Sequence, residues 1–246
     1  MKIILLGYGK MGHEVEQIAL QRGHEIVARI DKDKDSETQR LRDSETHEIV
    51  AIEFSTPATA LENINLCFDM NIPVVCGTTG WYEHLNDVKT RCEKENQSLL
   101  YAPNFSIGMN IMFMLNKQLA KLSEKYGYRL NLTETHHIHK LDKPSGTAVK
   151  LAEDIIANND NYNSWELTQC TMYNKQLTVG DILPVEAIRE GNVFGIHEVK
   201  AESDCDIIQL RHEAFSRKGF ATGAVIAAEF LLGKKGIFTM NDLFKI

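Results

Sequence analysis

Residues 2–12 have the sequence KIILLGYGKMG, a short apolar run that leads into three glycines. Gly7, Gly9 and Gly12 match the spacing G-x-G-x-x-G, in which glycines let a pyrophosphate approach the backbone where a helix begins. The motif alone is weak, because a plain tight turn also favours glycine. Its setting strengthens it: the apolar run predicts a strand, and residues 13–23 predict a helix that ends at Gly23. The stretch therefore predicts a dinucleotide-binding turn.

An acidic residue supports this interpretation. The next predicted strand, residues 24–31, ends in Asp31, about twenty positions after Gly12, where a carboxylate is expected to bind a ribose hydroxyl. A carboxylate there favours NAD, because it would repel a 2′-phosphate. Lys32 and Lys34 indicate that a phosphate could be tolerated. The sequence leaves the choice between NADH and NADPH open.

Strands and helices alternate through the first hundred residues, which predicts a parallel, doubly wound sheet. Residues 59–71 form one of the expected helices, with Ala60, Ile64, Cys67 and Phe68 on one face. Loops rich in Gly, Ser, Thr and Asn follow three of the apolar strands, at residues 54–57, 77–80 and 102–105. Ligands of such sheets bind outside the carboxyl ends of the strands. Ordinary turns between strands and helices use the same residue types.

The pattern changes after Phe105. A long helix is expected over residues 110–127, with an apolar stripe through Met112, Leu115, Leu119 and Leu122. Residues 129–212 are mostly strand-like, with an alternation such as Val193, Gly195, His197 and Val199, and one helix at residues 148–157. Residues 220–236 predict a last helix with small residues that suit close packing.

We therefore predict an α/β fold with two domains. Residues 1–106, completed by residues 217–246, form a Rossmann-like dinucleotide-binding domain with a parallel sheet. Residues 107–216 form a smaller α+β domain with a mixed or antiparallel sheet.

Composition limits the classes of function. The chain has 246 residues, 43% of them hydrophobic, and a formal net charge of −7, so it can bury a core and lacks the basic stripe of a nucleic-acid binder. No apolar run approaches the roughly 18 residues of a membrane span, and the apolar opening is too short for a signal peptide. Five cysteines without CxxC spacing are typical of thiols in a reducing cytosol. We expect a cytoplasmic protein with neither nucleic-acid nor membrane partners.

Residues 134–150, ETHHIHKLDKPSGTAVK, concentrate groups that can exchange protons. Strand alternation places Glu134, His136, Ile138 and Lys140 on one side. His137 and His139 then face the other way. Histidines on opposite faces cannot converge at about 2 Å on a metal, so we predict none. Hydrolysis through Ser145 lacks a nucleophile elbow, and a solvated strand end is the plain alternative.

The interpretation we prefer is a site that binds a small carboxylate-bearing substrate while that substrate is reduced. Ser145 is the expected N-cap of a helix, and the amides of Gly146 and Thr147 would bind a carboxylate at its positive end. Lys140 adds a positive charge, and His136 or His137 could give a proton near neutral pH.

The spacing within this run sets a geometric condition. If extended, residues 136 and 140 would lie about 13 Å apart, too far for one small substrate. Asp142 and Pro144 predict a bend that shortens the gap.

The run ETHHIHKLDKPSGTA, at residues 134–148, closely resembles the signature of the bacterial dihydrodipicolinate reductases, also named 4-hydroxy-tetrahydrodipicolinate reductases. The likeness continues, in matching order and over nearly the whole chain, through GYGKMG, CGTTG, APNFSIGMN, GDILPVEAIREGNVFGIHEV and HEAFSRKGFATGAVIAAEFLLGKKGIFTMNDLF. The resemblance implies NAD(P)H-dependent reduction of a cyclic dicarboxylate in diaminopimelate and lysine biosynthesis, by a cytoplasmic homotetramer assembled through the sheet of the second domain.

The resemblance also implies roles for individual residues. His136 would be the proton donor and acceptor and Lys140 a second proton donor, while hydride passes from the nicotinamide to the ring and the histidine protonates the adjacent carbon. The substrate would be held by His137, Ser145, Gly146 and Thr147. The cofactor would be held by Gly7, Tyr8, Gly9, Lys10, Met11, Gly12, Asp31, Lys32, Gly77, Thr78, Thr79, Ala102, Pro103, Asn104 and Phe105.

Two departures from the family pattern affect the cofactor. Many members have one more residue in the first glycine loop and an arginine in place of Lys10, and an acid–arginine pair where this chain has Asp31 and Lys32. Two other functions stay open: a related amino- or imino-acid dehydrogenase, and a dinucleotide sensor without turnover. Arg189 and His197 lie in family-like stretches, and we expect them to be structural.

Overall fold

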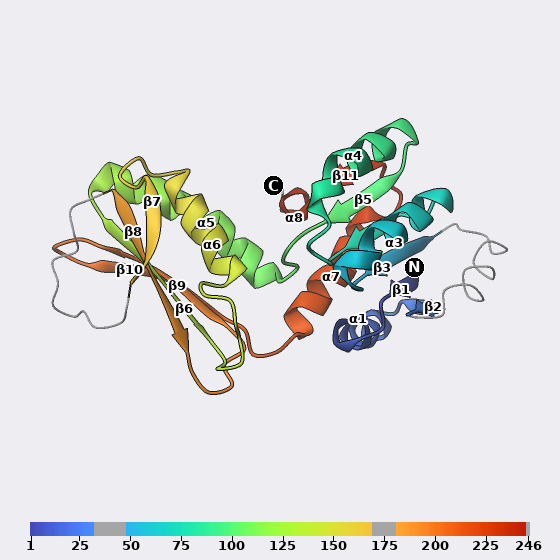
Figure 1. Cartoon of the computed structure of the whole chain (residues 1–246), viewed down its shortest axis with the longest axis horizontal. Coiled ribbons are helices and arrows are strands. Elements are labelled where there is room, and N and C mark those ends of the chain that lie inside the picture. Colours follow the sequence, from blue (N-terminus) through green and yellow to red (C-terminus); the bar gives the residue numbers. More distant parts are fainter. Residues whose placement is uncertain (32–47, 169–180, 245–246) are drawn as a thin grey trace. The chain divides into compact units, whose positions relative to one another are not determined.

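The computed structural model describes residues 1–31, 48–168 and 181–244. Lys32, Lys34 and Cys170 lie outside the described residues. The chain divides into two compact units: the first contains Met1–Ile107 and Arg217–Ile246, and the second contains Gly108–Ser216 (Figure 1).

Within the described residues, the first unit has a sheet of six parallel strands in the order β11-β5-β4-β3-β1-β2. The strands are β1 (Lys2–Leu6), β2 (Glu25–Ile30), β3 (Ile49–Glu53), β4 (Val74–Cys76), β5 (Ser98–Tyr101) and β11 (Gly236–Phe238). The chain runs from β1 outward to β2 and then returns to pair β3 on the other side of β1. The parallel sheet predicted from the alternating pattern is confirmed, and the strand order changes direction between β1 and β3, where such folds bind ligands.

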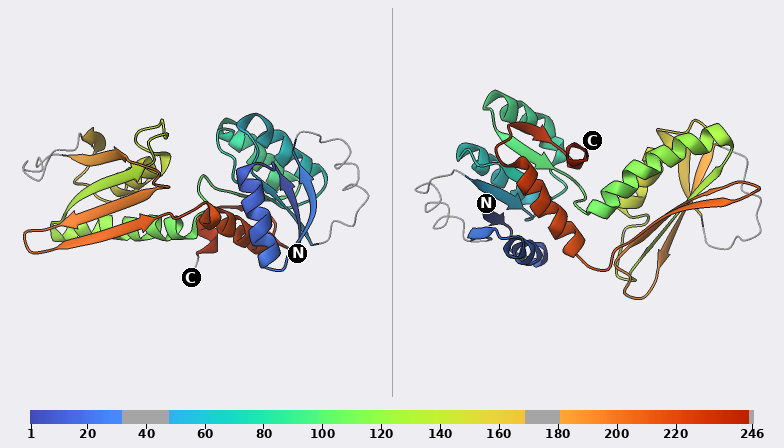
Figure 2. Two further views of the ribbon diagram at one scale, coloured as in Figure 1. Left: turned by 90° about the horizontal axis from the view of Figure 1, so that it is seen from below. Right: turned by 180° about the vertical axis from the view of Figure 1, so that it is seen from behind.

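Helices cover both faces of this sheet (Figure 2). They are α1 (Lys10–Gln21), α3 (Pro57–Asp69), η1 (Tyr82–His84), α4 (Leu85–Lys94), α7 (Lys218–Leu231) and α8 (Met240–Leu243). Alternate side chains of β1 supply the two cores: Ile3 and Leu5 pack in the core with α1 and α7, and Ile4 and Leu6 in the core with α3 and α4. The predicted face of α3 is buried.

Close packing of α7 explains its small residues. A side chain at Gly223 would overlap the backbone carbonyl of Phe105, so only glycine lets the helix lie against the loop after β5. Ala224, Val225 and Ala228 fill the core around this contact. The loop after β5 is thus held closely against α7.

In the part of the second unit that the structure describes, five strands form a mixed sheet in the order β10-β9-β6-β8-β7. The strands are β6 (Arg129–His136), β7 (Ser164–Thr168), β8 (Ile182–Arg189), β9 (Ile196–Glu202) and β10 (Ile207–Glu213). Central β6 pairs antiparallel with β9 and parallel with β8. The mixed sheet is as predicted, but Val193 and Gly195 precede the strand β9 rather than belonging to it.

Two helices, α5 (Ile107–Tyr126) and α6 (Gly146–Ile156), contribute with the sheet to the core of this unit. The predicted stripe on α5 is partly wrong: Met112 and Leu119 are buried, whereas Leu115 and Leu122 are 49% and 52% exposed. The buried face instead passes through Asn116, whose amide donates to the Leu151 carbonyl of α6 at 3.0 Å. A hydrophobic pattern cannot identify a face that includes a buried amide. None of the helices in the described ranges is long and apolar enough to cross a lipid bilayer.

Candidate functional site

The three glycines of the first turn differ in what surrounds them. Gly7 has φ +88°, and a side chain there would overlap the Phe54 carbonyl. A Cβ on Gly12 would lie 2.5 Å from the Gly7 carbonyl oxygen, so this glycine brings α1 close to β1. A Cβ on Gly9 would meet nothing within 4 Å. The outer glycines are needed by the fold, and the middle one borders open space, as the dinucleotide fingerprint requires.

Side chains beside this turn form a cluster that the sequence pattern does not predict. The Tyr8 hydroxyl donates to Glu16 of α1, and Glu16 also accepts from Arg29 of β2. The Arg29 guanidinium lies 5.8 Å from the centre of the Tyr8 ring. Its hydrogen bond lowers the pKa of Glu16, which therefore stays ionised. Exposed Asp31 follows directly after β2.

The loops after β3 and β4 are joined through one buried carboxylate, Glu53, the last residue of β3. It accepts hydrogen bonds from the Ser55 amide at 2.9 Å and the Cys76 thiol at 3.1 Å. The Ser55 amide also contacts the Thr78 hydroxyl at 2.9 Å. Burial, aided by the charge of Glu53, raises the pKa of the Cys76 thiol, which stays protonated. The predicted loop residues Thr78 and Ser55 are therefore brought together.

The remaining predicted cofactor residues are partly buried in the core and partly exposed. Ala102 and Phe105 are buried in the core, so their backbone atoms are the parts available to a ligand. Asn104 accepts the Ser106 amide at 2.9 Å. Side chains at Gly77 would overlap the Phe54 ring. Exposed positions in these segments are Lys10, Thr79 and Pro103, and Met11 is half-buried.

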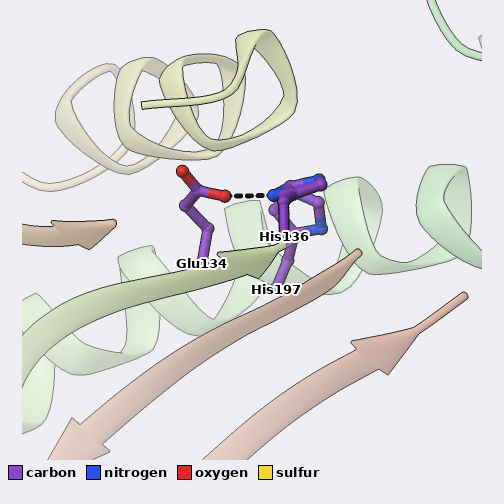
Figure 3. A group of neighbouring side chains, drawn as sticks. All are labelled: Glu134, His136 and His197. Atoms are coloured by element: carbon purple, nitrogen blue, oxygen red, sulfur yellow. Dashed lines mark hydrogen bonds and ion pairs between the residues drawn. The ribbon is translucent and has the colours of Figure 1, made fainter. Parts of the chain in front are cut away.

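The histidine site of the second unit contains Glu134 and His136, which lie two positions apart at the end of β6 (Figure 3). Both are buried, so they share one side of β6, as the alternation predicted. The Glu134 carboxylate accepts from His136 Nδ1, from Arg189 Nη1 at 2.9 Å and from the Ser145 amide at 3.3 Å. Burial alone would raise the pKa of Glu134, but the hydrogen bonds from His136 and Arg189 outweigh it and lower the pKa. The carboxylate is therefore ionised.

His197 of β9 lies opposite Glu134 in the strand register. Its ring centre is 5.1 Å from that of His136, and its Nε2 is 3.1 Å from the Ser145 hydroxyl. Burial, followed by the charge of His136, lowers the pKa of His197 to about 3. His197 is therefore neutral at physiological pH and holds Ser145 by a hydrogen bond rather than by charge.

The chain bends directly after His136. The Lys140 amide donates to the His137 carbonyl at 3.1 Å, which closes a turn. The alternation expected to continue to Ile138 and Lys140 is therefore wrong, and Ile138 is 60% exposed. Lys140 Nζ donates to Asp142 at 2.9 Å, and this bond lowers the pKa of Asp142. The predicted bend is present, but it begins before Asp142.

The predicted helix start is confirmed. Ser145 is the N-cap of α6, and its hydroxyl accepts the Ala148 amide at 3.2 Å. Gly146 is exposed and Thr147 half-buried at the first turn. His137, also expected to bind substrate, is half-buried beside His139, with ring centres 6.2 Å apart.

Three functional candidates were missed or undervalued: Glu134, Arg189 and His197. Glu134 carried a usable signal, because residues two apart on a strand share a face. Arg189 is the register partner of His136 on β8, and His197 is that of Glu134 on β9. Strand register is set by the tertiary structure, so residue spacing does not predict that these two lie beside Glu134 and His136; only their place in family-like stretches marked them.

Glu134, His136 and His197 each place a potential metal-ligand atom within 4.8 Å of the others. This set differs from the three neighbouring histidines considered from the sequence. Arg189 already neutralises the carboxylate at 2.9 Å, and its positive charge disfavours a cation there.

Two family models cover almost the whole chain. The model described as dihydrodipicolinate reductase, N-terminus, matches residues 1–105, and the model described as dihydrodipicolinate reductase, C-terminus, matches residues 108–244.

Individual relatives agree with the family models. The chain is 45% identical, over 99% of its length and 97% of the relative's, to the 4-hydroxy-tetrahydrodipicolinate reductase of Christiangramia forsetii. It is 30% identical to the enzyme of the same name from Lawsonia intracellularis, with 99% of each chain covered. Among solved structures, the dipicolinate-bound dihydrodipicolinate reductase from Paenisporosarcina sp. TG-14 has the same fold, with a TM-score of 0.75, 23% identity and 98% of each chain covered.

Proposed function

The chain belongs to the dihydrodipicolinate reductase family, and from this membership we propose that it reduces 4-hydroxy-tetrahydrodipicolinate to tetrahydrodipicolinate with NADH or NADPH. It is an oxidoreductase of diaminopimelate and lysine biosynthesis. The hydride comes from the nicotinamide and the proton from His136.

One observation carries the assignment of the site. Glu134 contacts both the His136 ring and the backbone amide of Ser145, the N-cap of α6. A proton donor therefore lies beside a helix start whose amides and positive end suit an anion. A cyclic dicarboxylate needs both: one group to fix a carboxylate and another to protonate the ring.

The residues that bind the substrate have different roles. Ser145 with the amides of Gly146 and Thr147 binds a carboxylate, and His137 supports it. Lys140 lies in the turn after His136 and supplies a positive charge, which it now shares with Asp142 at 2.9 Å. When the substrate binds, one of its carboxylates replaces Asp142 as the partner of the Lys140 ammonium. Lys140 then serves as the second proton donor.

The first unit holds the cofactor, which supplies the hydride when bound. The open space at Gly9 fits the approach of a pyrophosphate, since the flanking glycines show no such space. The backbone of residues 7–12, 77–79 and 102–105 binds it, and Asp31 faces the ribose. Lys32 contributes a positive charge next to Asp31. The cofactor is NADH or NADPH.

The division into domains follows these roles. Residues 1–106 with 217–246 bind the dinucleotide, and residues 107–216 bind the substrate. The second domain also assembles a homotetramer through its sheet. The enzyme works in the cytoplasm, as the biosynthetic family implies.

Cofactor oxidation tests this proposal directly. Absorbance of NADH and of NADPH is followed with the purified full-length protein, with and without the cyclic dicarboxylate substrate. We expect oxidation of at least one cofactor that depends on the substrate, and kcat/KM for each cofactor gives the preference. Tight cofactor binding without turnover would instead identify a sensor. Turnover of another imino acid alone would identify a related dehydrogenase.

A further inference from the structure

The Glu134–Arg189 ion pair lies at the centre of the substrate-site residues. Glu134 is fully buried and its carboxylate contacts His136 and the Ser145 amide as well as Arg189. The Arg189 side chain is 8% exposed. A buried ion pair of this kind is costly unless its remaining hydrogen bonds are made, and here each partner makes several.

The contact with Glu134 determines where His136 carries its proton. An ionised carboxylate can only accept hydrogen bonds, so Nδ1 of His136 must carry a hydrogen. Proton exchange with a substrate is then left to Nε2. The histidine side chain is 10% exposed, which leaves an edge accessible. A Cβ at residue 195 would lie 2.9 Å from Nε2, so Gly195 keeps side-chain atoms away from that nitrogen.

Arg189 extends the same network into the loop that carries Lys140. Its Nε donates to the Lys140 carbonyl at 3.3 Å, and its Nη2 donates to the Asp142 carbonyl at 2.5 Å. The planar guanidinium can make these bonds and the bond to Glu134 at once, which an ammonium group cannot. One side chain thus fixes the backbone of the loop between His136 and Ser145.

We propose that Glu134 and Arg189 are positioning residues for the reaction. Glu134 keeps a hydrogen on Nδ1 of His136, so Nε2 takes up a proton from water to form the imidazolium and then passes that proton to the substrate. Arg189 holds the Lys140 loop. This inference rests on the proposed function of the site. It gives Arg189 a role where the sequence suggested only structure.

Glu134→Gln tests the role of the carboxylate with little change in shape. The Gln oxygen can keep its contacts with Arg189 and the Ser145 amide, which places the NH₂ group against Nδ1. Two donors cannot face each other, so His136 must accept at Nδ1 and carry its single proton on Nε2. The ring then cannot become the doubly protonated imidazolium that gives a proton to the substrate. A mismatched tautomer in a histidine–carboxylate pair lowers turnover severely. We expect kcat to fall about 100-fold or more, with cofactor Kd unchanged and substrate KM within about threefold.

The tautomer itself is measured by ¹⁵N NMR of histidine-labelled protein without ligands, with the His136 signals assigned by their absence in His136→Gln. We expect Nδ1–H in the wild type and Nε2–H in Glu134→Gln. Glu153→Gln, whose side chain is exposed on α6, is the matched control and keeps wild-type kcat. A Glu134→Gln variant with kcat within threefold of wild type, or with Nδ1–H retained, would overturn the proposal.

Arg189→Lys provides a second test that holds if Glu134→Gln does not fold. Lysine keeps a positive charge beside Glu134 but cannot make both hydrogen bonds to the Lys140 and Asp142 carbonyls. We expect substrate KM to rise about tenfold with a smaller effect on kcat, and the His136 tautomer to stay as in the wild type. An unchanged substrate KM would exclude the role of Arg189. If the wild-type protein oxidises neither cofactor, the proposed function fails, while the NMR measurement still decides the role of Glu134.

Discussion

The glycine turn of the first unit and the histidine site of the second unit are built in opposite ways. The turn uses backbone: Gly7 and Gly12 are needed for close packing, and Gly9 borders open space. The histidine site uses side chains from three strands, with Glu134 and His136 on β6, Arg189 on β8 and His197 on β9. The residues of the turn lie next to one another in the chain, at positions 7–12. Those of the histidine site lie far apart in the chain and meet because their strands pair.

This contrast teaches which substitutions each site tolerates. A backbone site is disturbed by an added atom, because space is its function. A side-chain site is disturbed by a changed donor or acceptor, because the direction of its hydrogen bonds is its function.

His136→Gln should have the largest effect. Loss of the general acid should lower kcat by roughly 100-fold or more. Steady-state kinetics measure kcat, and fluorescence titration measures cofactor Kd, which should barely change. A collapse of cofactor affinity with turnover per bound enzyme preserved would show that His136 belongs to the other site.

Lys140→Ala should weaken substrate use. Removing a charge-assisted contact to a carboxylate typically costs about 1.5–3 kcal/mol, so kcat/KM for the substrate should fall roughly 10- to 100-fold. Asp142→Asn is the informative companion, since it removes the present partner of Lys140 at 2.9 Å but keeps the ammonium. An unchanged kcat/KM in Lys140→Ala would remove this lysine from the site.

Gly9→Ala should break the turn's function without breaking the fold. Its methyl group meets no protein atom within 4 Å but occupies the proposed path of the pyrophosphate. We expect cofactor Kd to rise about tenfold, equivalent to about 1.4 kcal/mol, at unchanged melting temperature.

Gly12→Ala is the matched contrast to that variant. Its Cβ would lie 2.5 Å from the Gly7 carbonyl oxygen. Such overpacking should lower the free energy of unfolding by about 1–3 kcal/mol, measured by urea titration. Equal cofactor affinity in Gly9→Ala and the wild type would contradict the proposed binding path.

Because of His197, the free energy of unfolding should decrease as the pH falls below neutral. Its folded pKa of about 3 lies below the unfolded value near 6.5, so the unfolded chain binds more protons as the pH falls through this window. The free energy of unfolding should therefore be about 1 kcal/mol lower at pH 5.5 than at pH 7.5 from this residue. His197→Gln should remove that difference, measured by urea unfolding at both pH values. A pH dependence identical to the wild type would show that burial does not perturb His197.

The sequence by itself determined what depends on near neighbours. The alternation of strands with helices predicted the parallel sheet, and alternation within strands predicted the mixed sheet and the shared side of Glu134 and His136. Helical spacing predicted the buried face of α3. The spacing of Gly7, Gly9 and Gly12 predicted the turn, and Ser145 predicted the start of α6. These features follow from periodicities of 2 and 3.6 and from local backbone chemistry.

Only the tertiary structure decided the rest. The face of α5 depends on Asn116, because a polar side chain can be buried when its partner, the Leu151 carbonyl, comes from another helix. The neighbours of His136 depend on register: Arg189 and His197 are 53 and 61 positions away in the chain and arrive through strand pairing. A linear pattern records which faces are apolar, whereas pairing decides which charges meet on the buried side.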